Sequence, residues 1–192
     1  MEIIKDLDIE VFDGVYKPSD DTYLLLGMIT LDGDESVLEI GSGTGIISIH
    51  CQIQGADTLS VDIDEKALDN TELNAENNNI HLSVKKSDLF SRITKDDWDV
   101  IIFNPPYLPE EKLTSKDRRW DGGKKGDEII IDFLEKADGY LSEDGELYFC
   151  YSSLAPEDKI KDLVEQKYRV LEIQKRRFFY ETLYGVKLIK YD

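Results

Sequence analysis

A glutamate and three glycines stand together where a short apolar run ends. Residues 36–40 (SVLEI) have the composition of a buried strand, and Glu39, Gly41, Gly43 and Gly45 spell E-x-G-x-G-x-G before a helix-like segment. Glycines allow a tight turn and a close approach of ligand to backbone, and the following helix offers free N–H groups. The pattern is typical of a nucleotide-binding loop, although a structural turn could use the same residues.

Acidic residues at two further strand ends narrow the choice of ligand. Asp62 ends the next strand, 21 residues after Gly41, and Asp88 ends the third. A carboxylate in the first of these positions can accept hydrogen bonds from ribose hydroxyls. The glycine spacing departs from the G-x-G-x-x-G of dinucleotide sites. Three acidic strand ends suit a nucleoside with a cationic group better than a pyrophosphate, which favours S-adenosylmethionine over NAD.

A second motif follows the fourth strand candidate. Asn104, Pro105, Pro106 and Tyr107 form the tetrapeptide N-P-P-Y, 63 residues after Gly41. Prolines could simply stop the strand. The whole tetrapeptide at the same sheet edge as the glycine loop is more specific than a strand stop.

The rest of the chain predicts elements that bring these loops together. Strands are expected at 36–40, 58–64, 80–90, 98–104 and 146–153, and helices at 45–54, 65–78, 127–141 and 156–167. Two closing strands, 169–179 and 181–190, lie too close together for a helical crossover, so they should pair antiparallel, with Gly185 interrupting the second. Alternating strands and helices predict an α/β fold whose mainly parallel sheet is covered on both faces.

Composition excludes several classes of protein. We expect one domain over residues 1–192, and the net charge of −18 argues against broad nucleic-acid binding. No apolar run approaches the length of a membrane span and the N-terminus is no signal peptide, so a cytoplasmic protein is expected. Two isolated cysteines, Cys51 and Cys150, give neither a disulfide framework nor a metal-ligand cluster, and no metal site is predicted.

The ordered set of motifs resembles a known family. LEIGSGTG, VDID, SDL, FNPPY and a W-x-G-G-x-x-G segment from Trp120 to Gly126 follow VYKPSDDTYLLL in sequence. Nearly the whole chain is similar to class I S-adenosylmethionine-dependent methyltransferases, and more narrowly to the HemK-like release-factor glutamine methyltransferases of the archaeal and eukaryotic kind. The resemblance implies a Rossmann-like fold, with a mainly parallel seven-stranded sheet, helices on both faces and an antiparallel C-terminal strand pair.

The resemblance also implies roles for individual residues. The cofactor-binding set would be Thr22, Glu39, Gly41, Gly43, Asp62, Asp88, Leu89 and Asn104. The target side chain would be held by Asn104, Pro105, Pro106, Tyr107 and Leu108, of which Asn104, Pro105 and Tyr107 would be catalytic. Tyr16 and Trp120 would contribute to the pocket wall. The chain departs from the family at Arg118, Arg119 and Asp121, around that tryptophan, so the resemblance specifies the chemistry more closely than the protein substrate.

These residue types suit the chemistry that the resemblance implies. A glutamine amide nitrogen is a poor nucleophile because its lone pair is delocalised into the carbonyl. The Asn104 side-chain oxygen and the Pro105 carbonyl would accept from its N–H bonds and hold the nitrogen in line with the methyl group. Tyr107 offers a flat face to a planar amide. Positioning and charge complementarity would then supply most of the catalysis, without a strong base.

Two further segments predict a lid over the active site and a binding site for a partner protein. Residues 108–126 form a long charged loop with Gly122, Gly123 and Gly126 as hinges, which we interpret as a lid over bound substrate. The few residues before the PSDDT segment leave no room for the N-terminal helical domain of bacterial relatives. The resemblance implies an activator as well, because relatives of the archaeal and eukaryotic kind are activated by a small zinc-binding protein on an edge strand. Residues 80–84 (IHLSV) are the candidate strand here, and the alternative is a monomer whose own loops cover that edge.

Other functions stay open at this stage. The release-factor glutamine in a Gly-Gly-Gln loop is the leading substrate, and an N6-adenine nucleic-acid methyltransferase is the first rival. The acidic charge and the lack of a target-recognition domain argue against that rival. A lysine methyltransferase would need a base that is not evident. A non-catalytic S-adenosylmethionine-binding subunit would not need the N-P-P-Y motif.

Overall fold

The computed structural model describes residues 7–106 and 127–191 of the chain. Within these residues the helices are α1 (Asp20–Met28), α2 (Ile46–Ile53), α3 (Glu65–Asn77), α4 (Glu128–Ala137) and α5 (Glu157–Lys167). The strands are β1 (Ser36–Ile40), β2 (Asp57–Asp62), β3 (Ser83–Lys86), β4 (Trp98–Phe103), β5 (Leu141–Ser152), β6 (Tyr168–Arg177) and β7 (Thr182–Lys190). None of the helices in this described part is long and apolar enough to cross a membrane.

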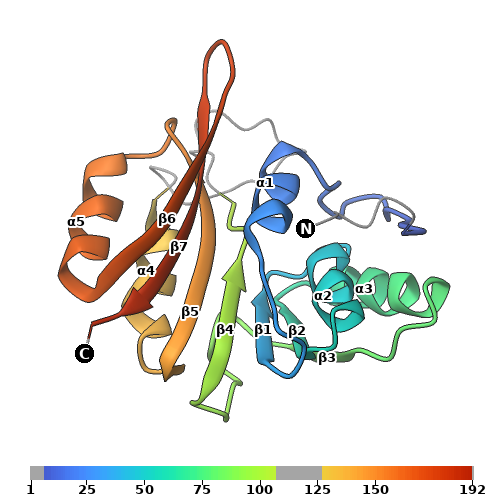
Figure 1. Ribbon diagram of the computed structural model, residues 1–192. Coiled ribbons are helices and arrows are strands. Elements are labelled where there is room, and N and C mark those ends of the chain that lie inside the picture. Colours follow the sequence, from blue (N-terminus) through green and yellow to red (C-terminus); the bar gives the residue numbers. More distant parts are fainter. Residues whose placement is uncertain (1–6, 107–126, 192) are drawn as a thin grey trace.

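The seven strands form one sheet in the order β3-β2-β1-β4-β5-β7-β6 (Figure 1). β1 to β5 run parallel, and β7 lies antiparallel between β5 and β6. The predicted fold class and the antiparallel closing pair are therefore confirmed. Connections between parallel strands are right-handed. The chain moves from β1 to β2 and β3 in one direction, which places α2 and α3 on one face of the sheet. It then moves from β4 to β5 and β6 in the other direction, which places α4 and α5 on the opposite face.

The two central strands explain why the sheet is stable. Four of the five β1 residues and five of the six β4 residues are buried. Strands covered on both faces have continuous apolar sequences, as in SVLEI and WDVIIF. The rigid centre of the sheet thus lies directly beneath the loops that carry the candidate chemistry.

The register brings three of those loops into one row. Ile40 pairs with both Val61 on β2 and Phe103 on β4. Gly41, Asp62 and Asn104 directly follow these three paired residues. They therefore lie side by side at the carboxyl edge of the sheet. The strand order reverses between β1 and β4, which is where open α/β sheets bind their ligands.

Five elements differ from the sequence-based prediction. α4 ends at Ala137 instead of 141, and β5 begins at Leu141 instead of 146, because Leu141 pairs with Trp98 on β4. β3 covers four residues instead of 80–90, because it pairs only with β2 and the backbone turns away after Lys86. β7 runs without interruption through Gly185, where a Cβ atom would come within 2.5 Å of the Met28 sulfur; the glycine admits α1 instead of breaking the strand. α1 was not predicted as a helix, because its nine residues contain no clear apolar periodicity.

An asparagine ladder fixes the segment that leads into α1. Asn70 and Asn74 on α3 and Asn78 at its C-cap lie one turn apart, and each side-chain oxygen accepts a backbone N–H from residues 8–12 at 2.8–3.0 Å. The Asn74 amide nitrogen donates to the carbonyls of Glu10 and Thr44, both at 2.9 Å. One buried side chain therefore connects the N-terminal segment to the glycine loop.

Candidate active site

A cavity of about 460 Å³ opens at the carboxyl edge of the sheet, above β1 and β4. Its walls come from the segment before α1, the glycine loop and the ends of β2, β3 and β4. The lining includes the predicted residues Tyr16, Thr22, Glu39, Gly41, Gly43, Asp62, Asp88, Leu89, Asn104, Pro105 and Pro106. Every predicted site residue that the structure describes is thus brought to one cavity.

Two predicted target-binding residues, Tyr107 and Leu108, lie outside the described residues, as do Trp120 and the predicted lid 108–126. Asp21 was missed by the sequence analysis although it lines the same cavity and is 2% exposed. The available signal was a second aspartate at the start of an apolar helix, next to a threonine already assigned to the pocket. Ile129, which lines the cavity from α4, had no signal in the motifs.

The glycine loop has a backbone that side chains rarely permit. Gly41, Gly43 and Gly45 have φ values of +70°, +56° and +76°. A Cβ atom on Gly45 would also lie 2.7 Å from the Thr71 methyl carbon and 3.1 Å from its Cα. The glycine therefore serves the close packing of the loop against α3. α2 begins at Ile46, so its free N–H groups follow the loop directly.

Glu39 is a buried carboxyl at the end of β1. One of its oxygens accepts from the Ser48 backbone N–H at 2.9 Å and from the Ser48 hydroxyl. Burial raises the pKa of Glu39 to about 8, with the nearby Asp62 adding to the effect and the Ser48 hydrogen bonds opposing it. A cation placed in the cavity would favour ionisation of this group.

Asp62 and the turn after β3 form the opposite wall. The Asp62 carboxylate accepts from the Gly43 N–H at 3.1 Å and from the Asp64 N–H at 2.9 Å, and burial raises its pKa above the usual value. These bonds fix the carboxylate beside the glycine loop. Leu89 has a φ of +43°, uncommon for a residue other than glycine. Strained backbone of this kind clusters at ligand sites.

A chain of hydrogen bonds orients the Asn104 side chain. The Thr22 hydroxyl donates to Asp21 at 3.2 Å, because a carboxylate can only accept. The Thr22 oxygen is then left as an acceptor, and the Asn104 Nδ2 donates to it at 3.3 Å. The Tyr16 hydroxyl donates to both Asp21 oxygens at 2.7 Å.

Within the described part of the protein, these hydrogen bonds leave the side-chain oxygen of Asn104 as an unpaired acceptor. Asn104 Oδ1 is buried and has no hydrogen-bond partner among the described residues. Buried acceptors are almost always paired in folded proteins, so an unpaired one in a cavity wall is suited to a ligand. The burial of Tyr16 and the adjacent Asp21 raise the pKa of the tyrosine well above its usual range, which keeps its hydroxyl a donor.

Fold and site together define a class I S-adenosylmethionine-dependent methyltransferase: a doubly wound sheet, a glycine loop after β1, an acidic residue at the end of β2 and another after β3, and Asn-Pro-Pro after β4. Residues 14–180 match the methyltransferase small domain family, and the chain belongs to that family.

Several named proteins are similar to this chain in sequence or in structure. The chain is 40% identical over 169 residues to a Methanocaldococcus jannaschii protein provisionally named a protein N5-glutamine methyltransferase, covering 83% of this chain and 85% of the relative. It is 29% identical over 186 residues to the release factor glutamine methyltransferase of Streptococcus pneumoniae, covering 88% of this chain and 66% of that protein. A Pyrococcus furiosus methyltransferase structure shares the fold with a TM-score of 0.71, at 22% identity over 96% of this chain and 89% of its own.

Proposed function

We propose that this enzyme uses S-adenosylmethionine to methylate the glutamine side-chain amide in the Gly-Gly-Gln motif of a class 1 peptide chain release factor. The observation that carries the proposal is the buried, unpartnered Asn104 Oδ1 in the cavity wall. A side-chain amide nitrogen is the kind of donor that this acceptor needs. The name of one relative, a release factor glutamine methyltransferase, supports this substrate, and the name of the other, a protein N5-glutamine methyltransferase, supports glutamine as the target.

The cavity fits the cofactor in the chemistry of its donors and acceptors. Asp62 would accept from the ribose hydroxyls, and Asp88 with the Leu89 N–H would meet the adenine. Thr22, Glu39, Gly41, Gly43 and Asn104 would surround the methionine part, where the buried carboxyl of Glu39 complements a cationic group. When bound, S-adenosylmethionine would supply a methyl group from its sulfonium and become S-adenosylhomocysteine, and the amide nitrogen would release one proton to solvent water.

The chain's own contribution is to hold the amide. Asn104 Oδ1 and the carbonyl of Pro105 would accept from the two N–H bonds of the target, which places the nitrogen lone pair toward the cavity. The fixed φ of Pro105 presents its carbonyl rigidly. Since Asn104 is itself held by Thr22, the acceptor is oriented before substrate arrives, and such preorganisation is an effective source of rate enhancement.

We also propose that a small zinc-binding activator pairs with the β3 edge. β3 lies at one end of the sheet order, as that interaction requires. The expected segment 80–84 needs correction, because the strand is Ser83–Lys86 and Ile80, His81 and Leu82 precede it. Its side chains include exposed Lys85 and Lys86, so backbone pairing would supply more of the contact than apolar burial. A cytoplasmic location stays a prediction.

A labelling experiment with Asn104→Ala tests the proposed function. The enzyme is incubated with methyl-labelled S-adenosylmethionine and release factor, with and without the zinc-binding protein. Wild type should label the factor, and Asn104→Ala should lower the rate about 100-fold or more while cofactor binding survives. Asn77→Ala, an exposed asparagine on α3, is the matched control and should keep full activity. Label on nucleic acid but on no protein would favour the adenine rival instead.

A further inference from the structure

We infer that the tip of the β6–β7 hairpin is a docking surface for the protein substrate of this methyltransferase; the inference rests on the proposed function. The tip consists of Phe178, Phe179 and Tyr180 with the flanking basic residues Lys175, Arg176 and Arg177. Phe179 and Tyr180 are 90% and 84% exposed, and Phe178 is 42% exposed. Adjacent exposed aromatics of this size on a folded chain mark interaction sites.

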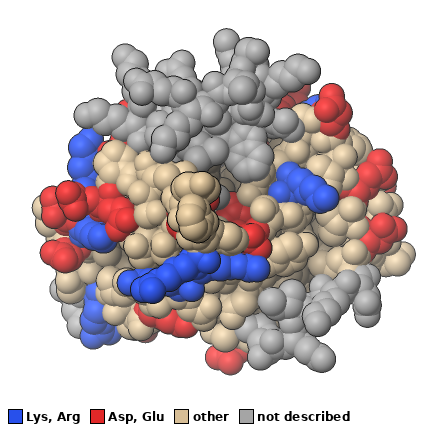
Figure 2. Space-filling model, turned by 90° about the horizontal axis from the view of Figure 1, so that it is seen from above, with Lys and Arg blue, Asp and Glu red and all other residues tan. Residues whose placement is uncertain are grey.

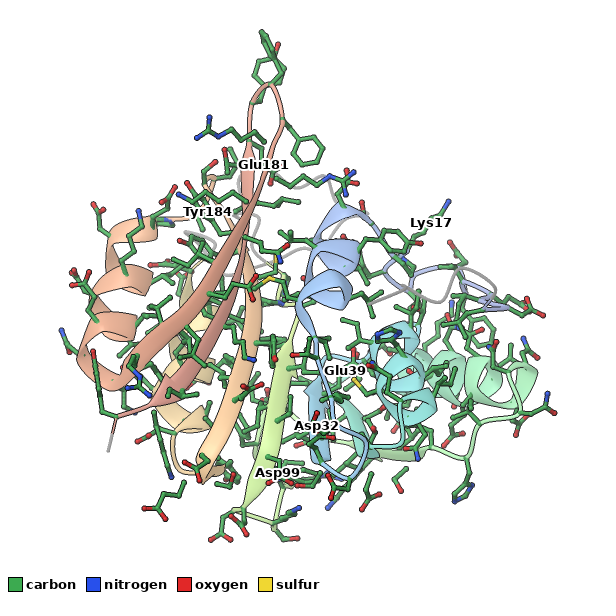
Figure 3. All side chains as sticks on the ribbon, viewed as in Figure 1. Lys17, Asp32, Glu39, Asp99, Glu181 and Tyr184 are labelled. Atoms are coloured by element: carbon green, nitrogen blue, oxygen red, sulfur yellow. The ribbon has the colours of Figure 1, made fainter. Side chains whose placement is uncertain are left out.

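The hairpin is placed beside the active-site cavity. Figure 1 shows it extending past the sheet on the side of the α1 N-terminus. Arg176 forms an ion pair with Asp20 at 2.9 Å, and the next residue, Asp21, lines the cavity. In Figure 3, Glu181, Tyr184 and Lys17 lie toward this end of the molecule, whereas Asp32 and Asp99 lie at the opposite end. A protein that inserts a loop into the cavity would therefore meet the tip.

The tip is fixed in shape before binding. Arg177 pairs with Thr182, and the Phe178 N–H donates to the Glu181 carbonyl at 2.7 Å across the turn. The rings of Phe179 and Tyr180 pack edge to face with centroids 4.6 Å apart. The Arg176 guanidinium lies 5.8 Å from the Phe178 ring centroid. A preorganised aromatic pair loses little conformational entropy on binding, which favours affinity.

Charge indicates which kind of surface the tip fits. The chain carries a net charge of −18, yet the end of β6 has three consecutive exposed basic residues, Lys175 to Arg177. Figure 2 looks down on this end and shows a stripe of basic side chains beside the projection at its centre. Tyr and Arg are enriched in binding hot spots, and Phe is enriched in protein–protein interfaces. The complementary partner is a protein surface with an apolar recess bordered by carboxylates, next to the loop that carries the target glutamine.

Substitutions at the tip test this surface. Phe179→Ser combined with Tyr180→Ser, and separately Arg177→Glu, should raise the KM for intact release factor about tenfold or more, with kcat and the cofactor Kd within twofold of wild type. A short peptide that contains only the Gly-Gly-Gln loop should be methylated equally by wild type and variants. Leu171→Ser, an exposed apolar residue farther along the same strand, is the matched control and should change nothing. An unchanged KM for the intact factor in both tip variants would overturn the inference.

A cross-linking arm separates this inference from the proposed function. Tyr180→benzoylphenylalanine should cross-link to the release factor on irradiation, and Leu171→benzoylphenylalanine should not. Cross-linking without methylation of the factor by wild type would refute the proposed function and retain the surface. Methylation without cross-linking, or cross-linking to added RNA in preference to the factor, would refute the surface and leave the proposed function standing.

Discussion

The chemistry of the site depends on one asparagine whose two ends are not equivalent. The Asp21 carboxylate accepts a hydrogen bond from the Thr22 hydroxyl, so the Thr22 oxygen accepts from Asn104 Nδ2, and Asn104 Oδ1 is left without a partner among the described residues of the cavity wall. Three residues thus decide which end of an amide meets the substrate. The order of donors and acceptors follows from a carboxylate that cannot donate.

Thr22→Val tests this orientation. The substitution keeps the shape but removes the acceptor for Asn104 Nδ2, so the amide is free to turn. We expect kcat for release-factor methylation to fall about tenfold, which corresponds to about 1.4 kcal/mol. Thr22→Ser retains the hydroxyl and should remain within threefold of wild type. Equal kcat values for the valine variant and wild type would show that Thr22 does not orient Asn104.

Glu39 gives the cofactor-free protein a pH-dependent stability. Its pKa is about 8 in the folded state against an ordinary value of 4.5. Between these values the unfolded chain has released the proton that the folded chain keeps, so the free energy of unfolding falls as pH rises through this window. Below pH 4.5 the Glu39 carboxyl is protonated in both the folded and the unfolded state, so its contribution to the free energy of unfolding no longer changes with pH.

Glu39→Gln should remove this contribution. Relative to wild type, the free energy of unfolding of the variant should rise by about 3 kcal/mol between pH 5 and pH 7.5, an order-of-magnitude figure from 1.36 kcal/mol per pKa unit. Urea unfolding of both proteins at the two pH values measures it without cofactor. Parallel pH profiles for the two proteins would contradict the raised pKa.

At the scale of elements, the loops are held by contacts that side chains make across long stretches of sequence. Asn74 on α3 is fully buried and bonds both the N-terminal segment and the glycine loop. Asn74→Ala leaves the Glu10 N–H and the Thr44 carbonyl without this partner. We expect a loss of about 2–3 kcal/mol in the free energy of unfolding. Asn77→Ala, on the exposed side of the same helix, should stay within about 0.5 kcal/mol in the same denaturation measurement.

Two glycine-to-alanine variants distinguish the cost of a strained backbone in the folded state from the gain of a less flexible unfolded chain. Gly45→Ala places a Cβ at a φ of +76° and 2.7 Å from Thr71, so it should cost about 2 kcal/mol or more and weaken cofactor binding. Gly27→Ala in α1 meets nothing within 4 Å and should stabilise by about 0.5–1 kcal/mol. Thermal unfolding and calorimetric cofactor titration measure both; a stable, tightly binding Gly45→Ala protein would contradict the packing described for the loop.

Much of this arrangement was predictable from the sequence. Buried central strands have apolar runs that local composition reveals, and parallel topology then places Gly41, Asp62 and Asn104 at one edge. The limits of β3 and the continuity of β7 at Gly185 were not predictable, because they depend on which strand or helix packs alongside. Asp21 was missed for the same reason: its burial is created by Tyr16 and the cavity, and no local pattern records it.

At the scale of the whole molecule, the cavity and the exposed aromatic residues of the β6–β7 hairpin lie at the same end of the sheet. The carboxyl ends of β1 to β4 hold the cavity, and the β6–β7 hairpin brings aromatic and basic side chains to that same end (Figure 3). Among the described residues of this acidic chain, the basic and aromatic hairpin tip beside the cavity is suited to a selective protein partner. Nucleic acid would require a broader basic surface.

The most direct test of the account is the location of the transferred methyl group. Purified enzyme, S-adenosylmethionine and release factor are incubated, and the factor is digested and sequenced by tandem mass spectrometry. We predict one methyl group on the side-chain nitrogen of the Gly-Gly-Gln glutamine, absent with Asn104→Ala and absent when that glutamine is replaced. A methyl group on a lysine, or on nucleic acid with the glutamine unmodified, would contradict the assignment of Asn104 Oδ1 as the acceptor for a glutamine amide.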